Sequence, residues 1–425
     1  MKAECDIEPL SLAGGLPDYA GLDVVEAGGI TSAIGFKAAG IHAGFRANPE
    51  RLDMALVVAD EPCACAATFT QNVFCAAPVI VSREHLDDVS YGTARALVVN
   101  SGVANAATGS KGLQAARQVA QIVGDAVGCP ASEVMVASTG VIGVHLNVGT
   151  FEEGVPLACE ALGANGNAAA RAIMTTDTHP KEFAVSFSGD EVGYPGCTFT
   201  VGGMCKGAGM IMPNMATMIA CLTTDVPVAP NDLHNALLRS VSASFNKITV
   251  DSDTSTNDCC YLFASGAAAP NGKHFEPGSA AFLLFEKALD AVCQTLARKM
   301  AADGEGATRL ITVRLAGAAN AAEADAAART IANSPLVKTA IFGHDANWGR
   351  IAAAAGRSGA RFVQEDVSID IMGIPVLRSG LPVPFDEDEA LRRFERPEID
   401  IDVDLGAGNS STTSGRATSR TTTLR

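Results

Sequence analysis

A lysine and a threonine mark the stretch of this sequence that is best suited to chemistry. The stretch begins at Lys206, continues through Gly207-Ala-Gly and Pro213, and ends in Ala216-Thr217. A threonine that follows a small residue can attack the preceding peptide carbonyl, and after cleavage it becomes an N-terminal nucleophile. Its own α-amine, with a reference pKa of about 7.7–8.0, can then serve as the base. The alternative is a glycine-rich turn that leads into a buried strand, and this stretch alone leaves both interpretations open.

Two further segments carry residues that suit an anion or a polar ligand. The predicted strand Val134–Ala137 runs into Thr139-Gly140, where glycine frees the backbone to present N–H groups to an anion. An ordinary strand-to-helix turn is the alternative. The segment Met174–Lys181 is rich in hydroxyls and contains Asp177, which fits either a capped turn or part of a binding site.

The polar segment Asp251–Asp258 places carboxylates at alternating positions, as metal-binding loops do. It lacks the central glycine and terminal glutamate of an EF-hand, so we predict a hydrogen-bonded loop that lines a site. The twelve cysteines are scattered, without a Cys-x-x-Cys pair, and the seven histidines are dispersed. We therefore expect no metal, and buried thiols in a reduced compartment.

The elements that must position these residues are short strands and helices that alternate irregularly. This pattern predicts an α/β or α+β layered architecture in two or three structural units. Predicted strands include Pro78–Val81, Ala94–Val99, Val134–Ala137, Phe183–Phe187, Cys197–Val201, Met218–Leu222 and Val337–Phe342. Predicted helices include Leu113–Val127, ending at Gly128, as well as Gly154–Ile173, Asn231–Phe245 and Ser279–Met300.

Composition and charge narrow the class of protein. Nearly half of the 425 residues are hydrophobic and the formal net charge is −16. An acidic chain disfavours nucleic acid and anionic membrane surfaces as partners. The first residues lack a cationic and apolar targeting pattern, and no run approaches the roughly 20 apolar residues of a membrane span. We expect a soluble, cytoplasmic protein.

Together these segments resemble a known family. Six segments are similar to the motifs of the ornithine acetyltransferases, the glutamate N-acetyltransferases of arginine biosynthesis: Lys206–Thr217, Thr139-Gly140, Thr175–Asp177, Asp251–Asp258, Asp303–Thr308 and Asp345–Arg350. The resemblance runs from about Gly28 to about Gly408. It implies a DmpA/ornithine acetyltransferase-like fold, which is similar to N-terminal-nucleophile hydrolases but differs in connectivity.

The resemblance also implies a self-cleaving precursor. The cut would fall between Ala216 and Thr217, giving an α chain of residues 1–216 and a β chain of residues 217–425. The implied assembly is an α2β2 heterotetramer.

The implied reaction moves an acetyl group from N2-acetyl-L-ornithine to L-glutamate by ping-pong chemistry, through an acetyl ester on Thr217. The motifs match Thr139 and Gly140 to the oxyanion hole, and Thr175, Lys206, Thr217 and Glu305 to substrate binding. From charge, we expect Lys206 to face a substrate carboxylate and Glu305 the ornithine amine. No cofactor is implied, and acetyl-CoA would be an additional acetyl donor in a bifunctional member.

The C-terminal residues depart from the family pattern. Family members continue with a Cys-Asp-Leu-Thr segment and a tail whose asparagine and final hydroxyl residue bind substrate, whereas this chain ends in Thr418–Arg425. We interpret residues 409–425 as an atypical tail and hypothesise a shifted reading frame. The alternatives to the transferase are an aminopeptidase or amidase of the same fold, or a member made inactive by this tail.

Overall fold

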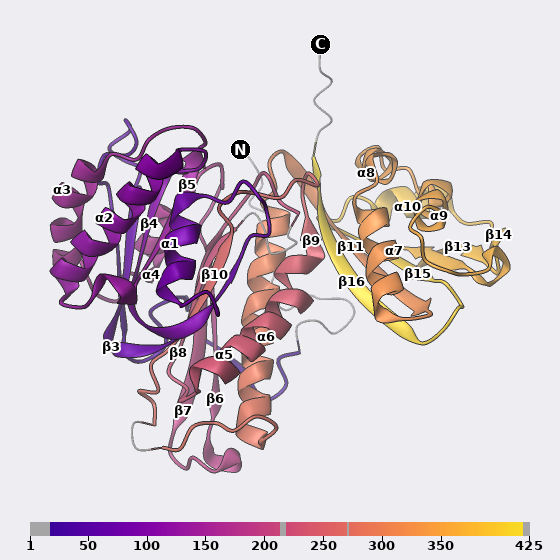
Figure 1. The fold of residues 1–425 in the computed structure, drawn as a ribbon. Coiled ribbons are helices and arrows are strands. Elements are labelled where there is room, and N and C mark those ends of the chain that lie inside the picture. Colours follow the sequence, from indigo (N-terminus) through magenta and orange to yellow (C-terminus); the bar gives the residue numbers. More distant parts are fainter. Residues whose placement is uncertain (1–17, 213–217, 270–271, 420–425) are drawn as a thin grey trace. The chain divides into compact units, whose positions relative to one another are not determined.

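The computed structural model describes residues 18–212, 218–269 and 272–419, which form two compact units (Figure 1). The large unit comprises residues 18–246 and 253–300, and the small unit comprises residues 247–252 and 301–419. Each unit contains one sheet with covering helices. This arrangement confirms the predicted mixed α/β class.

The sheet of the large unit has nine strands, ordered β1-β6-β7-β8-β10-β3-β4-β5 with β2 paired to β3. The pairs β8/β10 and β4/β5 are parallel, and the other pairs are antiparallel. The strands are β1 Asp23–Val24, β2 Phe36–Ile41, β3 Met54–Phe69, β4 Tyr91–Val103, β5 Val134–Val141, β6 Lys181–Ser188, β7 Thr198–Lys206, β8 Ile219–Thr224 and β10 Cys259–Ala264. Two strands that follow the Ala216–Thr217 bond, β8 and β10, therefore lie between β7 and β3, which precede it.

The strand β3 is long and allows this sheet to fold over itself. Its pairing with β4 shifts register between Val58 and Cys63. One buried core contains side chains from both halves of the sheet, among them Val99 of β4 and Phe263 of β10. The Tyr261 hydroxyl of β10 donates to the Val136 carbonyl of β5 at 3.2 Å, although these strands are not neighbours in the sheet. The first half of β5 therefore packs over the face of β10.

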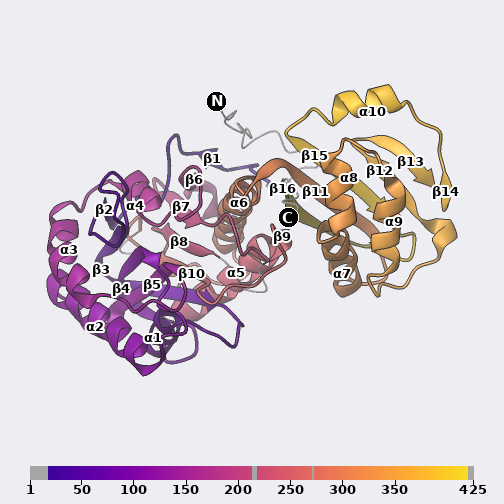
Figure 2. The ribbon, with the colours of Figure 1, turned by 90° about the horizontal axis from the view of Figure 1, so that it is seen from above.

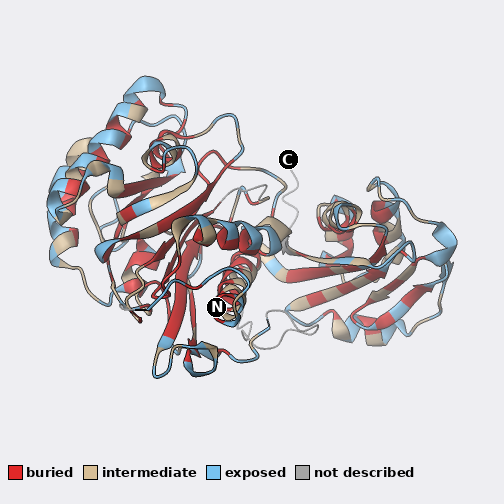
Figure 3. Ribbon diagram, turned by 60° about the horizontal axis from the view of Figure 1, so that its bottom comes forward, coloured by how far each residue is buried: buried red, intermediate tan, exposed pale blue. Residues whose placement is uncertain are grey.

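Helices cover both outer faces of the folded sheet. The first three helices bury alanine and valine against β3, β4 and β5, and two later helices lie on the other side of the strands (Figures 1 and 2). The strands are largely buried, whereas the helices expose their outer faces (Figure 3). The helices are α1 Ala77–His85, α2 Gly109–Val127, α3 Val148–Glu160, α4 Gly166–Ala172, α5 Pro230–Ala243 and α6 Ala280–Ala302, with short 3₁₀ turns at Ala131–Glu133, Asp190–Val192 and Phe245–Lys247.

The small unit is built on a seven-stranded sheet, ordered β14-β13-β12-β15-β11-β16-β9. Its apolar core consists mainly of isoleucine, valine and alanine from the strands and helices. The strands are β9 Ile248–Thr249, β11 Ala307–Ala318, β12 Ser368–Ile371, β13 Ile374–Arg378, β14 Leu381–Pro382, β15 Glu398–Asp404 and β16 Ser410–Ser419. The helices are α7 Ala321–Ala332, α8 Pro335–Phe342, α9 Trp348–Gly356, α10 Glu387–Arg393 and a 3₁₀ turn Gln364–Asp366.

The predicted atypical tail begins within this sheet. Residues 410–419 form β16, which pairs antiparallel with β11 and parallel with β9. The final residues, 420–425, lie outside the described residues. The tail contributes an interior strand, and its proposed frameshift stays a prediction.

Two predicted strands are wrong, because each is helical. Pro78–Val81 lies in α1 and Val337–Phe342 lies in α8, and both helices begin with a proline in the first turn. Proline is favoured at that position because its fixed φ suits a helix and its missing N–H needs no partner there. Ser334 reinforces the start of α8, since its hydroxyl accepts the Val337 N–H at 3.4 Å. These local signals outweigh the β-branched composition.

The predicted helix Gly154–Ile173 is two helices, α3 and α4. The chain between the two helices pairs with the edge of β2. There the Ala38 N–H donates to the Gly163 carbonyl at 2.9 Å, and the Gly163 N–H donates to the Ala38 carbonyl at 3.1 Å. The helix ending at Gly128 is confirmed, and Gly128 adopts a left-handed φ of 74°.

Candidate active site

The predicted residues Lys206 and Thr139 meet in the large unit. Lys206 is the last residue of β7 and Thr139 lies near the end of β5, 67 positions away in sequence. The Lys206 ammonium donates to the Thr139 hydroxyl at 3.3 Å. Both residues are buried, with 6% and 9% of their surface exposed. The folding of the sheet over itself brings these strand ends together.

The Asp177 carboxylate joins the backbone at Thr175 to the backbone next to Lys206, and both of these residues are predicted to bind substrate. The carboxylate accepts the Thr175 backbone N–H at 2.9 Å and the Gly207 backbone N–H at 2.6 Å. It also accepts the Lys181 ammonium at 2.7 Å, and both of these side chains are fully buried. Burial alone raises the pKa of Asp177, but the charges of Lys181 and Lys206 and these hydrogen bonds outweigh it and hold the pKa well below its ordinary value.

Thr175 is fixed from two sides. Its N–H is bound by Asp177, and its carbonyl accepts the Arg51 guanidinium at 3.0 Å. The neighbouring Met174 carbonyl accepts Arg46 at 2.8 Å, and Arg46 also donates to the Ser101 hydroxyl at 3.3 Å. The polar segment Met174–Lys181 is therefore a bound turn beside Lys206.

The charge of Lys206 depends on its neighbours. Burial lowers the pKa of the ammonium, Asp177 opposes this effect, and Lys181 adds to it. Asp258 also raises this pKa and Arg46 lowers it. A buried cation of this kind suits a carboxylate ligand, because the ligand would supply a further negative charge in a region of low dielectric, where burial disfavours the ammonium.

Gly140 lies against the neighbouring strand in a conformation that favours glycine. Its φ is +137°, and a Cβ atom built there would lie 2.2 Å from the Gly102 carbonyl carbon. Gly102 and Gly140 are paired between β4 and β5. The strand ends can approach this closely because Gly140 lacks a side chain, whereas a Cβ atom at Gly102 would face Phe45 and Arg46.

The predicted polar loop supports the end of β5. The Asn257 amide donates to the Ser138 carbonyl at 2.8 Å and to the Ala104 carbonyl at 2.6 Å. The Thr254 hydroxyl donates to the Met212 carbonyl at 3.1 Å, which ties the loop to the segment after Lys206. For residues 253–258, the prediction of a hydrogen-bonded loop is confirmed, and the prediction that it lines a substrate site stays a prediction.

Sequence reasoning did not single out Lys181 or Asn257. The four-residue spacing of Asp177 and Lys181 within a polar segment is a signal for an ion pair, but nothing local indicates that the pair is buried. Asn257 has no comparable signal, because its partners Ser138 and Ala104 are distant in sequence.

The described geometry does not test three of the predicted site residues. Ala216 and Thr217 lie outside the described residues. Glu305 belongs to the small unit, where it is exposed in the turn between α6 and β11. The roles of these residues stay predictions.

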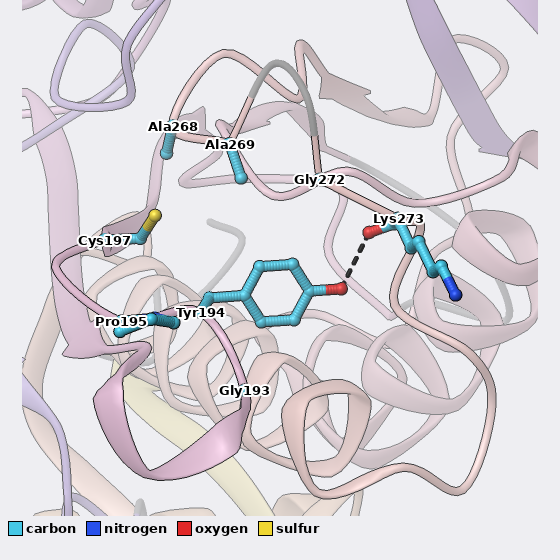
Figure 4. Close-up of a pocket in the computed structure, with 8 residues that line it drawn as sticks. All are labelled: Gly193, Tyr194, Pro195, Cys197, Ala268, Ala269, Gly272 and Lys273. Carbon is cyan, nitrogen blue, oxygen red and sulfur yellow. Dashed lines mark hydrogen bonds between the residues drawn. The ribbon is translucent and has the colours of Figure 1, made fainter.

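A pocket of about 460 Å³ lies at the opposite end of β7 (Figure 4). The Tyr194 hydroxyl projects across it and donates to the Lys273 carbonyl at 2.7 Å. The pocket is adjacent to Thr198, whereas Lys206 ends the same nine-residue strand. At about 3.3 Å per residue, the strand separates this pocket from the candidate site. It is lined by Gly193, Tyr194, Pro195, Cys197, Ala268, Ala269, Gly272 and Lys273.

Known proteins share this sequence over most of its length. A model of the ArgJ family matches residues 37–421. The arginine biosynthesis bifunctional protein ArgJ of Nitratidesulfovibrio vulgaris is 46% identical over 376 residues, which are 88% of this chain and 92% of that protein. The protein of the same name from Thermosynechococcus vestitus is 48% identical over 360 residues, 84% of each chain.

Two solved structures are also similar. The arginine biosynthesis bifunctional protein argJ of Bacillus halodurans is 42% identical with a TM-score of 0.45, covering 46% of this chain and 91% of that chain. The ornithine acetyltransferase of Mycobacterium tuberculosis complexed with ornithine is 39% identical with a TM-score of 0.41, covering 45% of this chain and 98% of that chain.

The described residues contain no helix that has both the length and the apolar character needed to cross a membrane.

The family match covers Lys206, Thr139 and the segments around them. It confirms the resemblance that these motifs predicted. With a family model over most of its length and relatives at 46% and 48% identity, this chain belongs to the ArgJ family.

Proposed function

We propose that this chain is an acetyltransferase of arginine biosynthesis that moves the acetyl group of N2-acetyl-L-ornithine to L-glutamate. Its relatives are named arginine biosynthesis bifunctional proteins. The observation that carries the proposal is the buried Lys206 ammonium beside the Thr139 hydroxyl. Lys206 can bind the α-carboxylate that both amino acids share, so that one pocket serves donor and acceptor in turn.

The first chemical step is self-cleavage. The Thr217 hydroxyl attacks the Ala216 carbonyl, the peptide C–N bond breaks, and the acyl group moves to the Thr217 oxygen while the α-amine takes up a proton. Water then hydrolyses this ester, which releases the Ala216 carboxylate and restores the hydroxyl. The product is a threonine whose amine is close to its own nucleophile.

Acetyl transfer reuses the same group. The Thr217 amine accepts the hydroxyl proton as the oxygen attacks the acetyl carbonyl of acetylornithine, and collapse of the tetrahedral oxyanion expels ornithine with that proton. The glutamate amine then attacks the acetyl ester and restores Thr217. Thr139 and Gly140 are proposed to stabilise both oxyanions, and loss of one such donor costs on the order of 10²–10³ in rate.

The remaining assignments complete the proposal. Glu305 would pair with the side-chain amine of ornithine, and Thr175 would contact the substrate. The nucleophile and base both come from Thr217, so the reaction needs no cofactor, although acetyl-CoA is a possible second acetyl donor for glutamate. We propose α2β2 assembly in the cytoplasm, where free cysteines such as those of this chain stay reduced.

The test combines one gel with one assay. Purified protein should give two bands of about half the 43.5 kDa precursor and should form acetylglutamate only when acetylornithine and glutamate are both present. Release of acetate from acetylornithine without transfer to glutamate would instead indicate the hydrolase of the same fold. A cleaved protein that does neither reaction would refute the proposal, and a parallel assay with acetyl-CoA decides the second activity.

A further inference from the structure

We propose that Asp177 is a positioning residue of this site, which holds the Thr175 turn and the Lys206 strand end in register through its buried carboxylate. The inference rests on the proposed function for the identity of the substrates, but its geometry is independent of them. Asp177 itself is not assigned a contact with substrate.

The hydrogen bonds of Asp177 lead to both binding segments. One carboxylate oxygen accepts the Thr175 N–H at 2.9 Å. The other accepts the Gly207 N–H at 2.6 Å, at the residue that follows Lys206. A single side chain thus fixes two backbone segments that are about thirty positions apart and that carry two of the predicted substrate contacts.

Lys181 makes this arrangement stable in the interior. Its ammonium donates to Asp177 at 2.7 Å, and neither side chain is exposed. Lys181 is the first residue of β6 and pairs with Cys205 of β7, next to Lys206. The ion pair is therefore anchored on the same strand pair that presents Lys206. A buried pair of this kind gives specificity of position, and loss of one partner leaves the other charge uncompensated.

Asp177 also sets the charge balance around Lys206. The groups that act on the Lys206 ammonium are Asp177 and Asp258, which favour its charged form, and Lys181 and Arg46, which oppose it. Replacement of Asp177 by asparagine removes a negative charge, whereas replacement of Lys181 by methionine removes a positive one. The two changes should therefore move the pKa of Lys206 in opposite directions.

The experiment compares Asp177→Asn, Lys181→Met and the control Asp60→Asn. Asp60 forms an ion pair with Lys37 at the same 2.7 Å distance, but that pair is exposed. We expect Asp177→Asn to lower kcat/KM about 100-fold, mainly through a higher KM for both amino acids, since a displacement of about 1 Å can cost that factor. The control should match the wild type.

The pH profile separates positioning from general stability. Activity should fall at alkaline pH as Lys206 loses its proton. This fall should occur at lower pH in Asp177→Asn and at higher pH in Lys181→Met. A folded Asp177→Asn variant with the wild-type KM and pH profile would overturn the inference, and if that variant does not fold, an unshifted profile in Lys181→Met would do the same.

Amide hydrogen exchange gives a readout that does not need catalysis. Peptides that contain Thr175 and Gly207 should exchange faster in Asp177→Asn than in the wild type, and Asp60→Asn should leave them unchanged. Unaltered exchange in these peptides refutes the positioning role even if acetyl transfer is absent. Absence of acetyl transfer from the wild type, with faster exchange in Asp177→Asn, refutes only the proposed function.

Discussion

Replacement of Gly140 by alanine is the sharpest perturbation of the proposed oxyanion hole. The new methyl carbon would lie 2.2 Å from the Gly102 carbonyl carbon, 2.4 Å from its oxygen and 2.6 Å from the Val103 nitrogen. All three are backbone atoms of β4, so no side chain can move aside. The φ of +137° adds strain for any residue with a side chain.

The expected loss of kcat follows from how far β4 and β5 must separate to admit the new methyl group. Cβ contacts below 3.0 Å are essentially not found, so relief of the 2.2 Å contact requires β4 and β5 to separate by about 0.8 Å. A shift near 1 Å at a reacting group can cost on the order of 10²-fold, and loss of an oxyanion donor costs 10²–10³-fold, about 2.7–4 kcal/mol. We expect kcat to fall by at least about 10²-fold, with a smaller change in KM.

The assay measures kcat for acetylglutamate formation, and a gel records the extent of self-cleavage, so that only cleaved protein is compared. Gly149→Ala is the matched control, because a Cβ there meets only the Asn147 side chain at an ordinary 3.4 Å. A thermal unfolding transition is used to check that Gly140→Ala is folded. A folded Gly140→Ala variant whose kcat is within about threefold of the wild type would refute the assignment of this strand end.

Three further predictions concern the nucleophile, a buried acid and the tail. Thr217→Ala should remain a single full-length band without acetyl transfer, whereas Thr217→Ser should cleave; a cleaved alanine variant contradicts the mechanism. The buried Asp225 carboxylate accepts the Ile34 and Thr200 N–H groups at 2.9 and 2.7 Å, yet burial raises its pKa to about 6. Because the folded protein then binds this proton more tightly than the unfolded chain does, the free energy of unfolding should fall by about 2 kcal/mol from this group as the pH rises from 4 to 6. Asp225→Asn should abolish that part of the slope in denaturant titrations, and an identical slope in both proteins contradicts the raised pKa. Ending the chain at Gly408 removes β16 from between β11 and β9, so circular dichroism should show a lower melting temperature; an unchanged melting temperature would mean that β16 adds no stability. Sequencing the 3′ end of the gene tests the shifted reading frame of the tail.

Local sequence patterns marked segments of the candidate site but not their arrangement. Glycines, hydroxyls and strand ends drew attention to the segments of Thr139, Thr175 and Lys206, and the family resemblance implied their roles. The structure places all three residues in the large unit. Their approach depends on the folding of β3 and its partners over one another, which is a long-range property. The burial of Asp177 and Lys181 depends on the same packing, so their spacing alone suggests only a surface pair.

The errors in secondary structure have a similar origin. Pro78 and Pro335 start helices that a β-branched composition had favoured as strands, and Gly163 breaks a helical pattern because it pairs with Ala38. In each case a start signal or a tertiary hydrogen bond outweighed the average preference of the segment.

The position of β8 and β10 between β7 and β3 constrains how the protein can be made. A polypeptide of residues 1–216 produced alone would have the facing edges of β7 and β3 without partners, and such open apolar edges promote aggregation. A polypeptide that begins at Thr217 would lack the strands on either side of its own pair. The two halves are therefore not independent folding modules, and separate expression followed by mixing should fail. Synthesis as one precursor would let the sheet form first, so the proposed scission would act on an already folded molecule.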